Sequence, residues 1–150
     1  MEHFIGIVTN YVLVCSVIGW FSAQIIKCVR YIVKTHSFNF AVLMASGGMP
    51  SSHSSTVCAM VVAVARMCGT NSAEFALAFI LAFIVMYDAA GVRRAAGEQA
   101  KVLNRIAKDI SEGDTQYLDK NLKELIGHTP FQVIMGALLG ILIPFLVPLF

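Results

Sequence analysis

Two histidines, each beside a proline turn, are the strongest chemical signal in this 150-residue sequence. His53 follows the run Gly-Gly-Met-Pro-Ser-Ser, and His128 stands directly before Thr129-Pro130. Proline next to serine or threonine is typical of the first residues of a helix. Helix N-termini carry free N–H groups and a partial positive charge, and they therefore attract anions. Both histidines are thus predicted to lie at anion-binding helix ends.

Positively charged side chains are predicted to lie at the same level as these histidines. Lys27 follows the first long apolar stretch, and Arg93 and Arg94 follow the third. Cations beside two helix N-termini and two imidazoles form the kind of site that binds phosphate. The alternative is that basic residues only cap helices and mark the cytoplasmic side of a membrane. We adopt that interpretation for four others, Lys34, Arg105, Lys108 and Lys120.

A single carboxylate, Asp88, interrupts the apolar stretch from Phe75 to Val92. An acidic side chain costs free energy inside a bilayer, so it is a functional candidate by default. It would pair with Arg93 or Arg94 on the same helix, or it would orient one of the histidines. The first arrangement is equally well a structural ion pair at the membrane interface.

The elements that would position these residues have the composition of membrane helices. Hydrophobic residues make up 57% of the chain and charged residues only 13%, whereas soluble domains carry about 25% charged residues. A bilayer core takes roughly 20 apolar residues in a helix, and four stretches fit, at 4–26, 54–71, 73–92 and 129–150. The sequence therefore predicts one all-α domain over residues 1–150, a multi-pass transmembrane helix bundle of about four spans.

The positive charges predict how such a bundle is oriented. Ten of the eleven Lys and Arg residues fall within 27–34 and 93–123. The positive-inside rule places both groups in the cytoplasm and both termini outside the cell membrane, with the site on the cytoplasmic side. Apolar residues at helical spacing within 93–112 and 118–126 predict cytoplasmic amphipathic helices. Arg66 is the exception, and its long side chain is expected to reach the outer interface.

Three blocks of the sequence resemble the type 2 phosphatidic acid phosphatase superfamily, specifically its small divergent bacterial and plastid branch. The blocks are SGGMPSSHSS at 46–55, YDAAGVRRAAGEQAKVLN at 87–104 and ELIGHTPFQVIMGALLG at 124–140. The resemblance implies a membrane lipid-phosphate phosphatase that hydrolyses phosphomonoesters through a phosphohistidine, with neither a metal nor another cofactor.

Carried over to this chain, the resemblance assigns roles to individual residues. His128 would be the nucleophile and His53 the general acid that protonates the leaving oxygen. Ser51 and Ser52 would donate to phosphate oxygens, and Lys27 would match the lysine of the superfamily's first motif.

The chain departs from the superfamily pattern at two positions. Gln132 stands where an aspartate would orient the nucleophile, and Leu122 stands where an arginine is expected. Arg93 or Arg94 would replace the arginine. The carboxylate would come from Asp88, or from Glu124 one helical turn before His128.

The expected partners are the lipid bilayer and a phospholipid or polyprenyl phosphate substrate, with no nucleic acid. Two other classes of function stay open: a non-catalytic transporter or lipid-phosphate-binding protein, and a metal enzyme using His53, Asp88, Glu98 and His128. The spacing of Gly136 and Gly140 allows close helix approach in lipid and so a homodimer, but packing within the bundle is the better explanation of these glycines.

Overall fold

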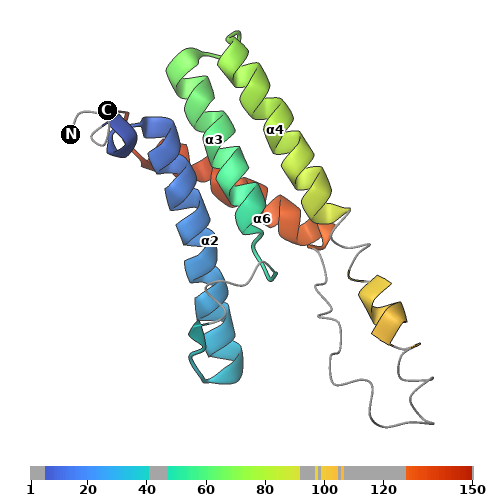
Figure 1. Ribbon diagram of the computed structural model, residues 1–150. Helices are drawn as coiled ribbons and strands as arrows, with labels where there is room; N and C mark the ends of the chain where they lie inside the picture. Colours follow the sequence, from blue (N-terminus) through green and yellow to red (C-terminus); the bar gives the residue numbers. More distant parts are fainter. Residues whose placement is uncertain are drawn as a thin grey trace.

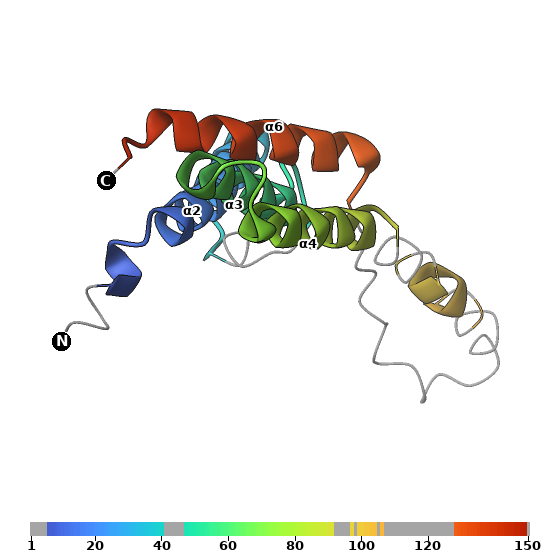
Figure 2. The ribbon, with the colours of Figure 1, turned by 90° about the horizontal axis from the view of Figure 1, so that it is seen from above.

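The computed structural model describes residues 6–40, 47–91, 97, 99–104, 106 and 128–149. Its long helices are α2 (Tyr11–Thr35), α3 (Ser52–Cys68), α4 (Ala73–Ala90) and α6 (Pro130–Leu146), and no strand occurs among the described residues. The predicted all-α class is therefore confirmed. α3 packs against the other three helices, and Figure 2 shows α6 as one layer with α2, α3 and α4 as the other.

Two of these helices meet the requirements of a membrane span by length and composition alone, namely α2 and α4, while α6 is apolar but has 17 residues. The count of four spans stays a prediction. Of the segment expected to form the first amphipathic helix, residues 97, 99–104 and 106 are helical. The rest of 93–112 and all of 118–126 lie outside the described residues.

The first helix differs from the expected span at 4–26. It begins after the N-cap Asn10 and continues to Thr35, where His36 takes a left-handed conformation with φ of 51°. Neither glycine nor proline occurs between Lys27 and Thr35 to end it earlier, and basic side chains are favourable near a helix C-terminus. The first basic cluster is therefore part of the helix.

The interior of the bundle is built from small residues, and its outer surface from large apolar ones. Cys15, Ala23, Ala59 and Ala63 are completely buried. Large side chains on α4, by contrast, face outward, and Leu77 is 72% exposed. Soluble proteins rarely expose a large contiguous apolar surface, whereas membrane helices associate through small residues and leave large ones to lipid. The distribution is that of a membrane bundle.

The two glycines of α6 allow that helix to approach α3 closely. A Cβ added to Gly136 would collide with the carbonyl oxygen of Ser51, and one added to Gly140 would collide with that of Ser55. Both glycines are therefore used for packing inside the chain. The homodimer expected from this pair loses its basis, because a face covered by α3 is not available to a second copy.

Three helix ends converge, as the mechanism suggested by the sequence requires. The start of α3 meets the start of α6 where Ser51 N donates to Gln132 O at 3.0 Å, and the start of α6 meets the end of α4 where His128 N donates to Ala89 O at 3.2 Å. Figure 1 shows these ends together, away from the turn that joins α3 to α4. The predicted convergence of His53 and His128 at one end of the bundle is confirmed.

Candidate active site

The two histidines form the centre of the site. Their ring centroids are 5.9 Å apart, and the planes are inclined by 64°. His53 lies in the first turn of α3, and His128 directly precedes Thr129, the N-cap of α6. His128 is only 3% exposed. Since reacting atoms approach to about 3–3.5 Å before a bond forms, one phosphoryl group fits within reach of both rings.

Gln132 fixes the protonation pattern of His128. The amide oxygen Oε1 lies 3.2 Å from His128 Nδ1, and it accepts a hydrogen bond from the backbone N–H of Thr129 at 3.1 Å. That second bond identifies the atom as oxygen, because an amide nitrogen could not accept from an N–H. An oxygen acceptor requires a proton on Nδ1. In the neutral ring, Nε2 then carries the lone pair.

The same bonds hold the start of α6. Thr129 Oγ1 accepts a hydrogen bond from Gln132 N at 3.4 Å, and together with the bond from Thr129 N to Gln132 Oε1 this forms a capping box. Pro130 occupies the first helical position. Gln132 thus has two functions, because one oxygen caps the helix and orients the imidazole. The sequence suggested only that an aspartate was missing at this position. The i, i+4 spacing from His128 was the available signal.

Lys27 reaches the start of α3 from the facing helix. It is 4% exposed, and its Nζ donates to Ser52 Oγ at 3.2 Å. Ser51 is fully buried, and its side chain accepts from Ser54 N at 3.3 Å as the N-cap of α3. The predicted grouping of Lys27, Ser51, Ser52 and the histidines is therefore present.

The remaining predicted residues divide into two sets. Asp88 is half-buried near the end of α4, and its neighbour Ala89 accepts the backbone N–H of His128. The structure thus places the segment around Asp88 beside the histidines. Arg93, Arg94 and Glu124 lie outside the described residues.

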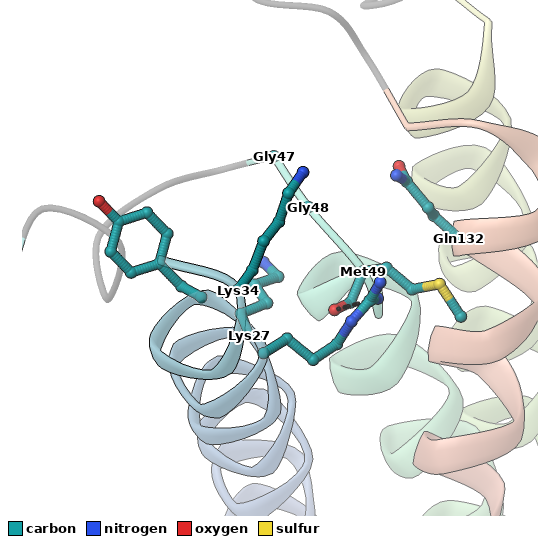
Figure 3. Close-up of a pocket in the computed structure, with 8 residues that line it drawn as sticks. Lys27, Lys34, Gly47, Gly48, Met49 and Gln132 are labelled. Atoms are coloured by element: carbon teal, nitrogen blue, oxygen red, sulfur yellow. Dashed lines mark hydrogen bonds between the residues drawn. The ribbon is translucent and has the colours of Figure 1, made fainter. Parts of the chain in front are cut away.

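A basic pocket of about 300 Å³ opens beside this group. Lys27 and Lys34 of α2 lie on one side of it, and Gln132 of α6 lies across from them (Figure 3). Arg30 of α2 also lines the pocket. Gly47, Gly48 and Met49 form a further wall, and Arg30 Nη1 donates to Met49 O at 3.3 Å. Neither imidazole is among the lining residues, but Lys27 and Gln132 each bond to the histidine-bearing segments.

Two of these cations were not predicted as site residues. Lys34 was interpreted as a residue that marks the cytoplasmic side, and Arg30 was not considered a ligand. Their signal was the i, i+3, i+7 spacing of Lys27, Arg30 and Lys34, which places three charges on one helix face. The spacing was not used, because the basic residues after the apolar span at 4–26 were interpreted as marking the cytoplasmic side of the membrane.

The metal alternative is not tested by the described part of the chain. Within the described residues, no group of three or more His, Cys, Asp and Glu side chains comes together. Glu98, which the metal alternative requires, lies outside those residues. The described site brings together one imidazole oriented by an amide oxygen, a second imidazole, a buried lysine and a helix N-terminus.

Comparison with known proteins identifies the class. Residues 8–143 match the Divergent PAP2 family, and the chain belongs to it; PAP2 denotes type 2 phosphatidic acid phosphatase. The sequence resemblance to that branch is thereby confirmed. The chain is also 40% identical over 147 residues to the "Uncharacterized membrane protein YuiD" of Bacillus subtilis (strain 168), covering 91% of this chain and 93% of that protein. No solved structure matches it.

Proposed function

We propose that this protein is a metal-independent membrane phosphatase that hydrolyses an amphiphilic phosphomonoester or pyrophosphate through a phosphohistidine. One observation carries the proposal. The ring centroids of His128 and His53 lie 5.9 Å apart, and Gln132 Oε1 lies 3.2 Å from His128 Nδ1, so Nε2 is the ring nitrogen that we assign to the attack on phosphorus. Membership of the Divergent PAP2 family supports the same chemistry.

In the first step, His128 Nε2 attacks phosphorus. A P–N bond forms while the bond to the leaving oxygen breaks, and His53 donates a proton to that oxygen. In the second step, His53 takes a proton from water, and the resulting hydroxide attacks the phosphohistidine. The P–N bond breaks, and inorganic phosphate leaves with both histidines restored.

The surrounding residues stabilise negative charge in both steps. Lys27 and the Ser52 hydroxyl, which already contact each other, lie where they can bind the phosphoryl oxygens, together with the N-terminus of α3. Ser51 holds the start of α3 through its two bonds, and we assign it a positioning role. Arg93, Arg94, Asp88 and Glu124 remain candidates for binding phosphate and for assisting the histidines.

The membrane supplies the substrate. The apolar outer surface, the two span-length helices and the similarity to a bacterial protein named as a membrane protein support a location in the bilayer. Lys27, Arg30 and Lys34 lie beside the site, and the positive-inside rule therefore favours a site that faces the cytoplasmic leaflet. Cysteines introduced at Asn71 and Gln116, in a background lacking the native four, should then be labelled from opposite sides by an impermeant maleimide.

The direct test is phosphate release by the purified protein from a panel of lipid phosphates. We expect turnover that is insensitive to EDTA, is inhibited by vanadate, and is abolished by His128→Ala in a protein that still inserts and folds. Turnover lost on chelation and restored by a divalent ion would favour a metal enzyme. Saturable binding of these lipids without any phosphate release would instead support a transporter or lipid-binding protein.

A further inference from the structure

The basic pocket described above continues into an apolar groove. The groove has a volume of about 460 Å³ and lies between α2 and α6, where it is lined on the apolar side by Ile26, Met135, Leu138, Leu139 and Leu142. Arg30 and Met49 line both cavities. The two cavities therefore form one continuous surface, cationic toward the ends of the helices and apolar along their length. A ligand that fills both must be an anionic amphiphile.

The basic pocket is separate from the position of the reacting phosphate. Gln132, which lines the pocket, occupies the Nδ1 side of His128, whereas the attacking lone pair is on Nε2, at a different edge of the ring. Three of the eight lining residues are cationic, and none of those described is acidic. Three cations without a carboxylate beside a second anion-binding position fit a second phosphate group.

Lys27 connects the two positions. Lys27 lines the basic pocket, where its stem lies beside Gly48, while its Nζ donates to Ser52 Oγ next to His53 in the sequence. Because its ammonium group has three N–H donors, a lysine in this position can contact two phosphates of one ligand at once. The order along the ligand is then the hydrocarbon chain, the inner phosphate and the terminal phosphate.

We propose that the site takes an amphiphile with two phosphates, which extends the proposed function and rests on it. The terminal phosphate is hydrolysed at the histidines, the inner one binds among Lys27, Arg30 and Lys34, and one hydrocarbon chain lies in the groove between α2 and α6. The inner phosphate is either a phosphodiester, as in phosphatidylglycerophosphate, or the proximal phosphate of a polyprenyl diphosphate. Phosphatidate, with a single phosphate, leaves the basic pocket empty.

The groove contributes alignment more than affinity. A chain that moves from lipid into a groove of leucine and methionine gains little hydrophobic free energy, because lipid tails are as apolar as those side chains. Its effect is to hold the head group in register with the histidines, so that filling the groove with a bulky side chain should lower turnover of chain-bearing substrates selectively.

The first experiment compares phosphatidylglycerophosphate, polyprenyl diphosphate and phosphatidate in mixed detergent micelles. We expect kcat/KM to be at least about tenfold higher for one or both two-phosphate lipids. Arg30→Gln should reduce this preference about tenfold or more, because it removes a charged hydrogen-bond donor to the inner phosphate. It should leave kcat/KM for phosphatidate within about threefold of wild type. Lys101→Gln, which removes the same charge outside the pocket, should leave the preference intact. Equal rates for all three lipids in wild type and Arg30→Gln would overturn the inner-phosphate site.

The second experiment tests the groove with a matched pair of variants. Leu138→Trp fills the groove on α6, and Leu81→Trp adds the same bulk on α4; the two leucines are 51% and 49% exposed. Leu138→Trp should lower kcat/KM for the long-chain lipids at least about tenfold and leave p-nitrophenyl phosphate, which has no chain, unchanged. Leu81→Trp should affect neither. Equal effects of both variants would overturn the assignment of the groove.

A third readout does not depend on hydrolysis. Phosphatidylglycerophosphate with a photoactivatable diazirine on one acyl chain should label Met135–Leu142 of α6, and excess unlabelled two-phosphate lipid should compete better than phosphatidate. Labelling of this kind without turnover of any lipid would refute the phosphatase and support the binding site. Labelling spread evenly over α4 and α6 would overturn the binding site, whatever the enzyme activity.

Discussion

One cation packs within the bundle near each end, Lys27 buried and Arg66 half-buried, and the two differ in the partners that the chain provides for them. Arg66 Nη1 donates to Tyr11 OH and to Val147 O, at 3.3 Å in the latter case. Its guanidinium also lies 5.5 Å from the centre of the Tyr11 ring and 5.7 Å from that of Phe145. Among the described residues, Lys27 Nζ has one acceptor, Ser52 Oγ. It also borders an open pocket.

The difference separates a structural cation from a functional one. Arg66 ties the start of α2 to the ends of α3 and α6, and Tyr11 OH completes the cluster by donating to Pro144 O at 2.7 Å. Lys27 has three donor protons, and one is used by Ser52, so its remaining donors are available to a ligand. A buried charge with few acceptors of its own is costly, and a bound phosphate would offset that cost.

The largest expected effect comes from neutralising the functional cation. Lys27→Met should lower kcat/KM by about a hundredfold or more, equivalent to about 2.7 kcal/mol. Thermal stability in detergent should change little or rise, because a desolvated ammonium group is replaced by an apolar side chain of similar length. A Lys27→Met protein with the kcat/KM of wild type would show that Lys27 has no more of a functional role than Arg66.

Gln132 provides a smaller and more specific test. Gln132→Leu removes the acceptor that orients His128 and should lower kcat about 5- to 30-fold, the equivalent of one hydrogen bond of about 1–2 kcal/mol. Gln132→Glu should retain or raise the rate, since a carboxylate accepts the Nδ1 proton more strongly.

The control for this pair is Thr129→Ala. It weakens the same helix cap by about 1 kcal/mol and leaves the contact between Gln132 and His128 in place. Its kcat should stay near that of wild type, with only the melting temperature lowered. An equal loss of kcat in Thr129→Ala and Gln132→Leu would mean that Gln132 acts through the helix start alone.

The smallest effect on turnover is expected at the other end. Arg66→Met removes the hydrogen bonds to Tyr11 and Val147 and should lower the free energy of unfolding by about 2 kcal/mol. The kcat of the folded protein should not change, which melting curves and activity per folded molecule would establish together. A large loss of kcat at unchanged stability would make Arg66 part of the functional machinery.

Local signals in the sequence were sufficient to predict where the site-bearing helices begin. Ser51 caps α3, Thr129 caps α6, and Pro130 follows at its first position, all as expected from residue types that pre-set those turns. The distribution of charge then predicted that these ends converge with the end of α4.

Other features depend on contacts that no local pattern reveals. The basic residues after the apolar span at 4–26 were interpreted as marking the membrane boundary, so Arg30 and Lys34 were not recognised as pocket residues. Arg66 was expected to reach the outer interface, but Tyr11 and Val147 lie 55 and 81 residues away in sequence. Their meeting depends on tertiary packing.

The role of Gln132 could not be predicted from the sequence for a different reason. Its spacing from His128 was visible, yet the residue type suggested a missing charge. Only the position of Oε1, between His128 Nδ1 and Thr129 N, indicates that a neutral amide can orient the ring.

The proposed mechanism requires that His128 becomes phosphorylated, and trapping the phosphohistidine would show whether it does. Acid quenching would destroy a phosphohistidine, so the reaction with labelled substrate should be quenched in alkaline detergent. We expect an acid-labile, base-stable phosphoprotein in wild type and none in His128→Ala. With p-nitrophenyl phosphate, whose leaving group needs no proton, His53→Ala should accumulate the phosphoprotein because its hydrolysis lacks a base. Phosphate release by His128→Ala at the wild-type rate, or a phosphoprotein that persists in that variant, would show that His128 is not the nucleophile.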